Sequence, residues 1–145
     1  MIYFDTSFLV PLLLPEATSD KVARFLRALP APELTISHWV RVEFSSLLGR
    51  EVRMGGLAPA MAARADAQFE AMIAKSFVIL LPDGADFDRA KEFLGRPETG
   101  LRAGDALHLA IAANHRAKAV YSLDTTLIKA GRILGLPVSA GIRPS

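Results

Sequence analysis

The chain has 145 residues, no cysteine, and 17 basic against 15 acidic residues. This length fits one domain over residues 1–145, and the missing cysteines exclude disulfides and zinc–thiolate sites and suit a reducing cytoplasm, the expected location. The first residues lack the basic segment of a signal peptide, and the longest apolar run, around Phe77–Leu81, is too short to span a bilayer.

Short apolar segments alternate with segments of helical spacing along the chain. Strands are expected at residues 2–4, 34–36, 77–81, 119–123 and 137–139. Helices are expected at residues 19–29, 37–54, 59–73, 86–94, 102–116 and 125–134. This alternation predicts right-handed crossovers and an α/β fold, with helices on both faces of a mostly parallel sheet. Only residues 140–145 resemble a loose tail.

Four acidic residues stand where apolar sequence ends or is interrupted. Asp5 and Asp124 each follow an expected strand directly, whereas Glu43 and Asp105 lie within the apolar patterns of two helices. Burying a carboxylate is unfavourable unless it is compensated, and the hard oxygens of several carboxylates suit Mg²⁺ or Mn²⁺. Because parallel sheets bind ligands beyond the carboxyl ends of their strands, a shared site is expected there. A metal-dependent hydrolase of phosphate esters is therefore the leading interpretation.

Each acid also has a purely structural explanation. The two acids that follow strands suit helix N-caps or Asx-turns. Glu43 would pair with a neighbouring base such as Arg41 or Arg50. Asp105 would itself be an N-cap after Gly104, since aspartate is unfavourable inside a helix. Capping does not exclude metal binding, so both explanations stay open for these residues.

Four segments together carry a resemblance to a known family. They are Asp5-Thr6-Ser7 after the first strand, Glu43 in the second long helix, Leu101–Ala110 around Asp105, and Ser122-Leu123-Asp124. In these segments and in length the chain resembles the PIN-domain family, specifically the VapC-type toxins of bacterial and archaeal toxin–antitoxin pairs. Ser122 departs from the threonine often found there, and Leu127 replaces the usual aromatic residue.

The resemblance implies a three-layer α/β/α fold and a Mg²⁺- or Mn²⁺-dependent endoribonuclease. It also implies an acidic cluster made of Asp5, Glu43, Asp105 and Asp124. We rank Asp5 and Asp105 first as direct metal ligands, while the other two bind directly or through water. Thr6 and Ser122 are expected to hold carboxylates or water in place. One or two ions would lower the pKa of a bound water and stabilise the transition state.

Partners follow from the resemblance and from charge. A homodimer and a small VapB-like antitoxin are implied, and helices 19–29 and 37–54 would form a groove for an antitoxin helix, although core packing explains the same residues. The expected substrate is tRNA or rRNA. A net charge of +2 and a pI near 9.2 weakly favour a polyanion. The basic residues proposed to contact RNA are Arg50, Arg53, Arg96 and Arg102.

Two other functions stay open. A phosphatase would use Asp5 as its nucleophile, but Ser7 stands where such enzymes carry a second aspartate. A non-catalytic module that binds RNA or protein would keep the fold and the basic surface without needing all four acids. A metal-free nuclease would need two histidines facing one substrate, and His38, His108 and His115 are interpreted instead as surface or hydrogen-bonded residues.

Overall fold

Five strands and seven helices alternate along residues 1–143, the part of the chain that the computed structural model describes. The strands are β1 (Ile2–Phe4), β2 (Leu34–Ser37), β3 (Val78–Leu80), β4 (Ala119–Tyr121) and β5 (Val138–Ser139). The helices are α1 (Thr6–Leu13), α2 (Ser19–Arg27), α3 (His38–Arg53), α4 (Pro59–Ser76), α5 (Gly84–Leu94), α6 (Ala103–Asn114) and α7 (Thr125–Ile133). Short 3₁₀ turns occupy Ala31–Glu33 and Pro97–Thr99.

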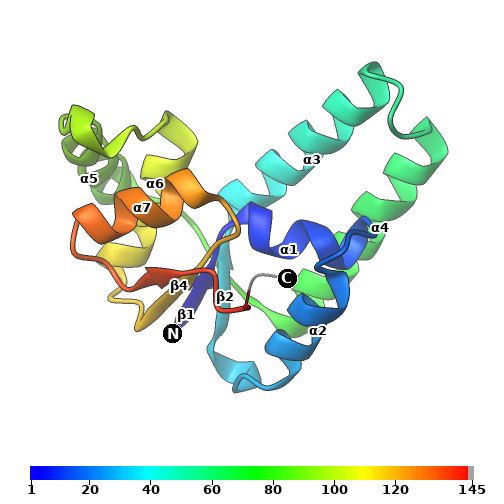
Figure 1. Cartoon of the computed structure of the whole chain (residues 1–145), viewed down its shortest axis with the longest axis horizontal. Coiled ribbons are helices and arrows are strands. Elements are labelled where there is room, and N and C mark those ends of the chain that lie inside the picture. Colours follow the sequence, from blue (N-terminus) through cyan, green and yellow to red (C-terminus); the bar gives the residue numbers. More distant parts are fainter. Residues whose placement is uncertain (144–145) are drawn as a thin grey trace.

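The five strands form one parallel sheet in the order β3-β2-β1-β4-β5. Ile2 and Phe4 of the central strand face a core built with α1 to α4, whereas Tyr3 faces a second core built with α5 to α7. Figure 1 shows the two groups of helices on opposite sides of the sheet. The predicted three-layer α/β/α fold with a parallel sheet is confirmed.

Helix α1 was not predicted from the sequence. It contains Pro11, which has no N–H to donate, and all four residues from Phe8 to Pro11 are buried. A helix that is apolar on most sides lacks the alternation of polar and apolar faces by which a surface helix is identified. Its start at Asp5 was the only local signal, and that residue alone is equally compatible with a turn.

The sheet is extended first on one side of β1 and then on the other, so the point at which the strand order switches lies between β1 and β4. Strands β2 and β3 are added on one side of β1, and β4 and β5 on the other. Crevices at the carboxyl edge of such a switch point are the usual ligand sites of parallel sheets. Asp5 follows β1 directly, and Asp124 stands shortly after β4.

The segment expected to be a loose tail is described as far as Arg143. Gly141 has a φ of +70° and lies against Phe25 and Tyr121, where a Cβ atom would overlap both rings. Ile142 packs against the core on the side of α1 to α4. Residues 144 and 145 of the expected tail lie outside the described part. Within residues 1–143, no helix combines the length and the apolar character needed to cross a membrane.

Candidate functional site

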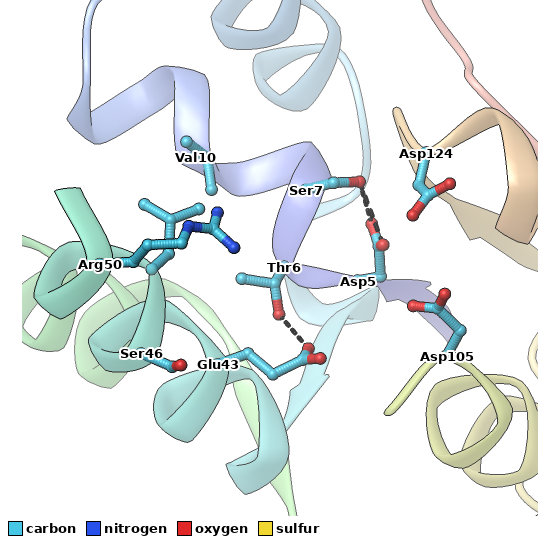
Figure 2. Close-up of a pocket in the computed structure, with 10 residues that line it drawn as sticks. Asp5, Thr6, Ser7, Val10, Glu43, Ser46, Arg50, Asp105 and Asp124 are labelled. Atoms are coloured by element: carbon cyan, nitrogen blue, oxygen red, sulfur yellow. Dashed lines mark hydrogen bonds between the residues drawn. The ribbon is translucent and has the colours of Figure 1, made fainter. Parts of the chain in front are cut away.

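One pocket brings together the four acids singled out in the sequence. It has a volume of about 330 Å³ and is lined by Asp5, Thr6, Ser7, Val10, Glu43, Ser46, Leu47, Arg50, Asp105 and Asp124. Figure 2 shows the three aspartates facing one another, while Glu43 approaches from α3 beside Thr6. The acids come from the ends of β1 and β4 and from two helices, so the packing of the sheet and its helices is what assembles the pocket.

Asp5 is held by the first turn of α1. Its Oδ1 accepts hydrogen bonds from the Ser7 hydroxyl at 2.8 Å and the Phe8 amide at 3.3 Å, which makes it the N-cap of the helix. The Ser7 oxygen in turn accepts the Leu123 amide at 2.9 Å. Only 4% of Asp5 is exposed, and burial raises its pKa although these hydrogen bonds act to lower it. Ser7 therefore fixes Asp5 to the loop after β4.

Asp124 is the N-cap of α7. Its Oδ1 accepts the amides of Thr126 at 2.9 Å and Leu127 at 3.2 Å, whereas Oδ2 accepts no hydrogen bond from the described residues. The buried Ser122 hydroxyl accepts the Asp124 amide at 3.0 Å. Ser122 thus holds the backbone of this acid, and one carboxylate oxygen stays available to a ligand.

Asp105 lies in the first turn of α6, whose N-cap is Arg102, so the alternative that Asp105 is itself the cap is wrong. Its carboxylate accepts no hydrogen bond from residues 1–143. Burial, and then the negative charge of Asp124, raise its pKa to about 6, with Asp5 and Glu43 adding to the rise. Asp105 is therefore the least compensated acid of the pocket.

Glu43 has two donors on one oxygen. Its Oε1 accepts the Thr6 hydroxyl at 2.6 Å and also contacts Nε2 of His108. Burial acts to raise the Glu43 pKa, but the hydrogen bond and charge of His108, together with Thr6, outweigh it and lower the pKa. The structural alternative in which Glu43 pairs with Arg41 is wrong, because Arg41 binds Glu70 at 2.6 Å. Thr6 holds a carboxylate, as expected.

Of the arginines proposed to contact RNA, Arg50 is the one that lines the pocket. Its side chain extends from α3 toward α1 (Figure 2), and within the described residues it forms no ion pair, neither with Glu43 nor with another acid. Arg96 is paired with Glu98 at 2.7 Å. Arg53 and Arg102 do not line the pocket. A single exposed guanidinium thus stands beside four carboxylates.

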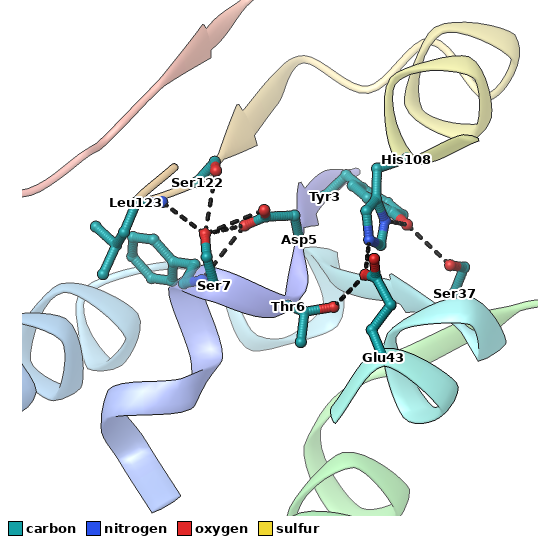
Figure 3. A network of polar contacts seen from close by, with 10 residues as sticks. Tyr3, Asp5, Thr6, Ser7, Ser37, Glu43, His108, Ser122 and Leu123 are labelled. Atoms are coloured by element: carbon teal, nitrogen blue, oxygen red, sulfur yellow. Dashed lines mark hydrogen bonds and ion pairs between the residues drawn. The ribbon is translucent and has the colours of Figure 1, made fainter. Parts of the chain in front are cut away.

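Sequence reasoning missed the residues behind the pocket. The Tyr3 hydroxyl lies 2.7 Å from Nδ1 of His108 and 2.8 Å from the Ser37 hydroxyl (Figure 3). His108 was expected to be hydrogen-bonded or on the surface, and the first of these holds. One signal was available, because His108 follows Asp105 by three residues and such residues share a helix face. The role of Ser7 had no comparable signal.

The donor chemistry of the pocket fits a hard divalent cation. Oxygen atoms of four carboxylates line it, and those of Asp105 and Oδ2 of Asp124 are free of hydrogen bonds from residues 1–143. Across these residues, however, no three acidic or histidine side chains stand close enough to hold one ion together. A shared ion would therefore require the carboxylates to move closer to one another.

The fold and the pocket define a class of protein, an α/β domain with a carboxylate cluster at the carboxyl edge of a parallel sheet. The model of the PIN domain family matches residues 2–133. The chain belongs to the PIN domain family.

Solved structures extend this result. The chain is similar to the toxin VapC20 of Mycobacterium tuberculosis, described as cleaving the sarcin–ricin loop, with 21% identity, a TM-score of 0.73, and coverage of 99% of this chain and 100% of the other. It is also similar to FitAcB of Neisseria gonorrhoeae, with 18% identity, a TM-score of 0.70 and coverage of 97% and 98%. A toxin–antitoxin complex of Klebsiella pneumoniae matches with 21% identity, a TM-score of 0.65 and coverage of 99% and 100%. The resemblance to VapC-type toxins is confirmed at the level of fold. A comparison with curated protein sequences gave no match.

Proposed function

We propose that the chain is a Mg²⁺- or Mn²⁺-dependent endoribonuclease and the toxin of a type II toxin–antitoxin pair. One observation carries the proposal: four carboxylates from separate segments line one pocket, and one of them, Asp105, has its pKa raised to about 6. Uncompensated charge of this kind is unfavourable for folding and is typical of sites that bind a cation or perform chemistry.

The pocket residues would divide the work between binding and positioning. Asp5 and Asp105 are the first-ranked ligands of the ion, with Glu43 and Asp124 binding directly or through water. A bound ion would lower the pKa of a water molecule and offset charge on the phosphate. Ser7 holds the Asp5 carboxylate at 2.8 Å, so this oxygen is oriented before any ligand arrives.

RNA would enter along the side of the pocket formed by α3. Arg50 lines this side and is free to bind a phosphate next to the one that is cleaved. Single-stranded or looped RNA reaches such a pocket more readily than a regular duplex. We propose tRNA or rRNA as the substrate, in keeping with the sarcin–ricin loop named for the Mycobacterium tuberculosis toxin.

An antitoxin would bind next to the acids. A groove beside α1 and α3, lined by Leu14, Leu57, Glu16 and Glu51 among others, shares Val10 and Leu47 with the acidic pocket. Residues 19–29, expected to form one wall of such a groove, do not line it. A helix laid in this groove would cover the entrance to the carboxylates. The Klebsiella pneumoniae structure is a toxin–antitoxin complex, which supports a partner of this kind. The toxin unit itself is proposed to be a homodimer.

The test is cleavage of a panel of tRNA and rRNA fragments by the purified chain, freed of any bound partner. Reactions with Mg²⁺, with Mn²⁺ and with EDTA are compared for the parent, Asp5→Asn and Asp105→Asn. Asparagine keeps the N-cap of α1, so folding is preserved. Asp88→Asn, on the exposed surface of α5, is the matched control. We expect discrete products that require metal, Asp5 and Asp105 but not Asp88.

Other outcomes would favour the other functions. RNA binding without cleavage, unchanged by EDTA and by Asp5→Asn, would indicate a non-catalytic module. A phosphate trapped covalently on Asp5 would indicate a phosphatase. The sequence disfavours this last function, because Ser7 stands where such enzymes carry a second aspartate.

A further inference from the structure

Three polar side chains are buried behind Glu43, outside the pocket itself. Tyr3 and Ser37 are fully buried, and His108 is 1% exposed. They come from β1, the end of β2 and α6, and none of them lines the pocket. Burying three polar groups is unfavourable unless each is hydrogen-bonded, and here they bond to one another in a chain that ends on Glu43 (Figure 3).

The donor and acceptor roles in this hydrogen-bond chain follow from Glu43, the residue at its end. An ionised carboxylate only accepts hydrogen bonds, so Nε2 of His108 carries the hydrogen that points at Glu43. The other ring nitrogen, Nδ1, faces the Tyr3 hydroxyl at 2.7 Å, and that hydroxyl lies 2.8 Å from Ser37. The histidine ring is therefore fixed on both sides, by Tyr3 and by Glu43.

The hydrogen-bond chain restricts one oxygen of Glu43, and the other lies beside Gly104 and the indole of Trp39. Oε1 receives both His108 and the Thr6 hydroxyl, the latter at 2.6 Å. Oε2 lies against the first turn of α6, where a Cβ atom on Gly104 would be only 2.8 Å away. A glutamate side chain has several rotatable bonds and loses conformational entropy when a ligand immobilises it. If the protein already holds it in one conformation, this loss does not weaken ligand binding.

We propose that Tyr3 and His108 are positioning residues, which hold Glu43 in the conformation that receives a divalent cation without touching the cation themselves. This inference rests on the proposed function, since it assumes that Glu43 contributes to metal binding. Residues that orient the ligands of a metal typically change its affinity about 10- to 100-fold when they are removed.

The experiment measures Mn²⁺ affinity of the full chain without RNA, by electron paramagnetic resonance of the free ion. His108→Leu is expected to weaken binding about 10- to 100-fold, and Tyr3→Phe, which removes one oxygen and keeps the ring in the core, by a smaller factor. His108→Gln, whose amide can donate in place of Nε2, is expected to recover most of the affinity. His115→Leu, on the exposed residue that ends α6, is the matched control and is expected to bind normally.

A double-mutant cycle separates positioning from a general loss of packing. If His108 acts through Glu43, the variant carrying both His108→Leu and Glu43→Gln binds Mn²⁺ no more weakly than Glu43→Gln alone. Fully additive losses would overturn the inference. The Tm of each variant is measured to show that it is folded. If His108→Leu does not fold, Tyr3→Phe provides the test by itself.

The same titrations distinguish failure of the proposed metal site from failure of the positioning role alone. Unchanged Mn²⁺ affinity in both Asp5→Asn and Glu43→Gln would overturn the proposed metal site as a whole. Weakened binding in those two variants, with parental affinity in His108→Leu and Tyr3→Phe, would overturn the positioning role alone.

Discussion

The four pocket acids are compensated to different degrees by the protein itself. Glu43 has two strong donors, Asp5 and Asp124 cap helices, and Asp105 has no donor within the described residues. Burial raises the pKa of both Asp5 and Asp105, and for Asp105 the negative charge of Asp124 adds to burial and brings the pKa to about 6. A cation would relieve both acids, and Asp105 is the one with no hydrogen-bond donor among the described residues.

Asp105→Asn is expected to stabilise the metal-free protein at neutral pH. The folded state holds this proton more tightly than the unfolded state, so the stabilisation present below the ordinary pKa of 3.8 is lost as pH rises through about 6. Because the residue is only half-buried, solvent screening reduces the gain to about 1 kcal/mol, or about 2–4 °C in Tm. Thermal melting in EDTA between pH 3.5 and pH 7.5 (about the range of the titration) measures this difference in Tm between the variant and the parent.

The pH dependence provides the control for this prediction. The parent and Asp105→Asn should melt alike at the acidic end and diverge as pH rises, whereas Asp88→Asn should follow the parent throughout. A variant that is equally destabilised at every pH would show that Asp105 has a packing role instead.

Gly104→Ala is expected to separate metal binding from stability. The new Cβ would lie 2.8 Å from Oε2 of Glu43 and 3.3 Å from Nε1 of Trp39, so the end of the Glu43 side chain would have to shift out of the position in which His108 and Thr6 hold it. The free energy of unfolding should change by less than about 1 kcal/mol, since alanine also favours the helix. Mg²⁺ affinity, read from the rise of Tm with Mg²⁺, should fall about 10-fold. Unchanged affinity would mean that Glu43 does not need its present position.

At the scale of elements, the contact between α7 and the edge strand β5 depends on Gly131. A Cβ there would overlap the side chain of Val138, whose own Cβ would lie 2.9 Å away. Gly131→Ala should therefore push α7 from β5 and lower the free energy of unfolding by about 1–3 kcal/mol. Urea unfolding measures this, and Gly49→Ala in α3, where a Cβ meets Arg53 at an ordinary 3.4 Å, should instead be neutral or stabilising.

The strands and most helices were predictable from the sequence because their signals are local. Ser37 stands at the N-cap position of α3 as expected, although its hydroxyl bonds to Tyr3 and makes no capping hydrogen bond. Pro59 begins α4 as expected for a first-turn proline. Helix α1 was missed because it is apolar on most sides and contains Pro11. Local patterns identify elements that are half exposed better than those that are buried.

The candidate site was predictable in its acids but not in their partners. An acid inside an apolar pattern is visible in the sequence, as Asp105 was. The partner of Glu43 was sought among its helical neighbours, yet it is His108, 65 residues away along the chain. Only the folded arrangement, which places α3 and α6 on either side of the central strand's carboxyl end, brings this pair together, and no periodicity within either helix encodes it.

At the scale of the whole molecule, the acids are distributed unevenly. Four of the 15 acidic residues line one pocket, so the 17 basic residues dominate the remaining surface more than the net charge of +2 indicates. Such a surface attracts a polyanion over long range, while the four carboxylates of the pocket repel it.

RNA binding should consequently depend on salt, and Arg50 should carry part of that dependence. For a single-stranded RNA with Mg²⁺ present, Arg50→Ala is expected to reduce the slope of log affinity against log salt by about 0.7–1, the effect of one phosphate contact. Fluorescence anisotropy at several salt concentrations gives the slope. Arg132→Ala, exposed in the last turn of α7, is the control, and an equal loss there would assign the effect to net charge alone.

The capping roles of Asp5 and Asp124 constrain which substitutions these two positions can accept over evolutionary time. Each side chain begins a helix, so replacement by alanine would cost about 0.5–2 kcal/mol of stability, whereas asparagine caps equally well. Under the proposed function, lineages that lose the nuclease activity but keep the folded chain should therefore accumulate asparagine or serine at these positions. The sequence of an inactive descendant would then record which of its acids had been structural as well as chemical.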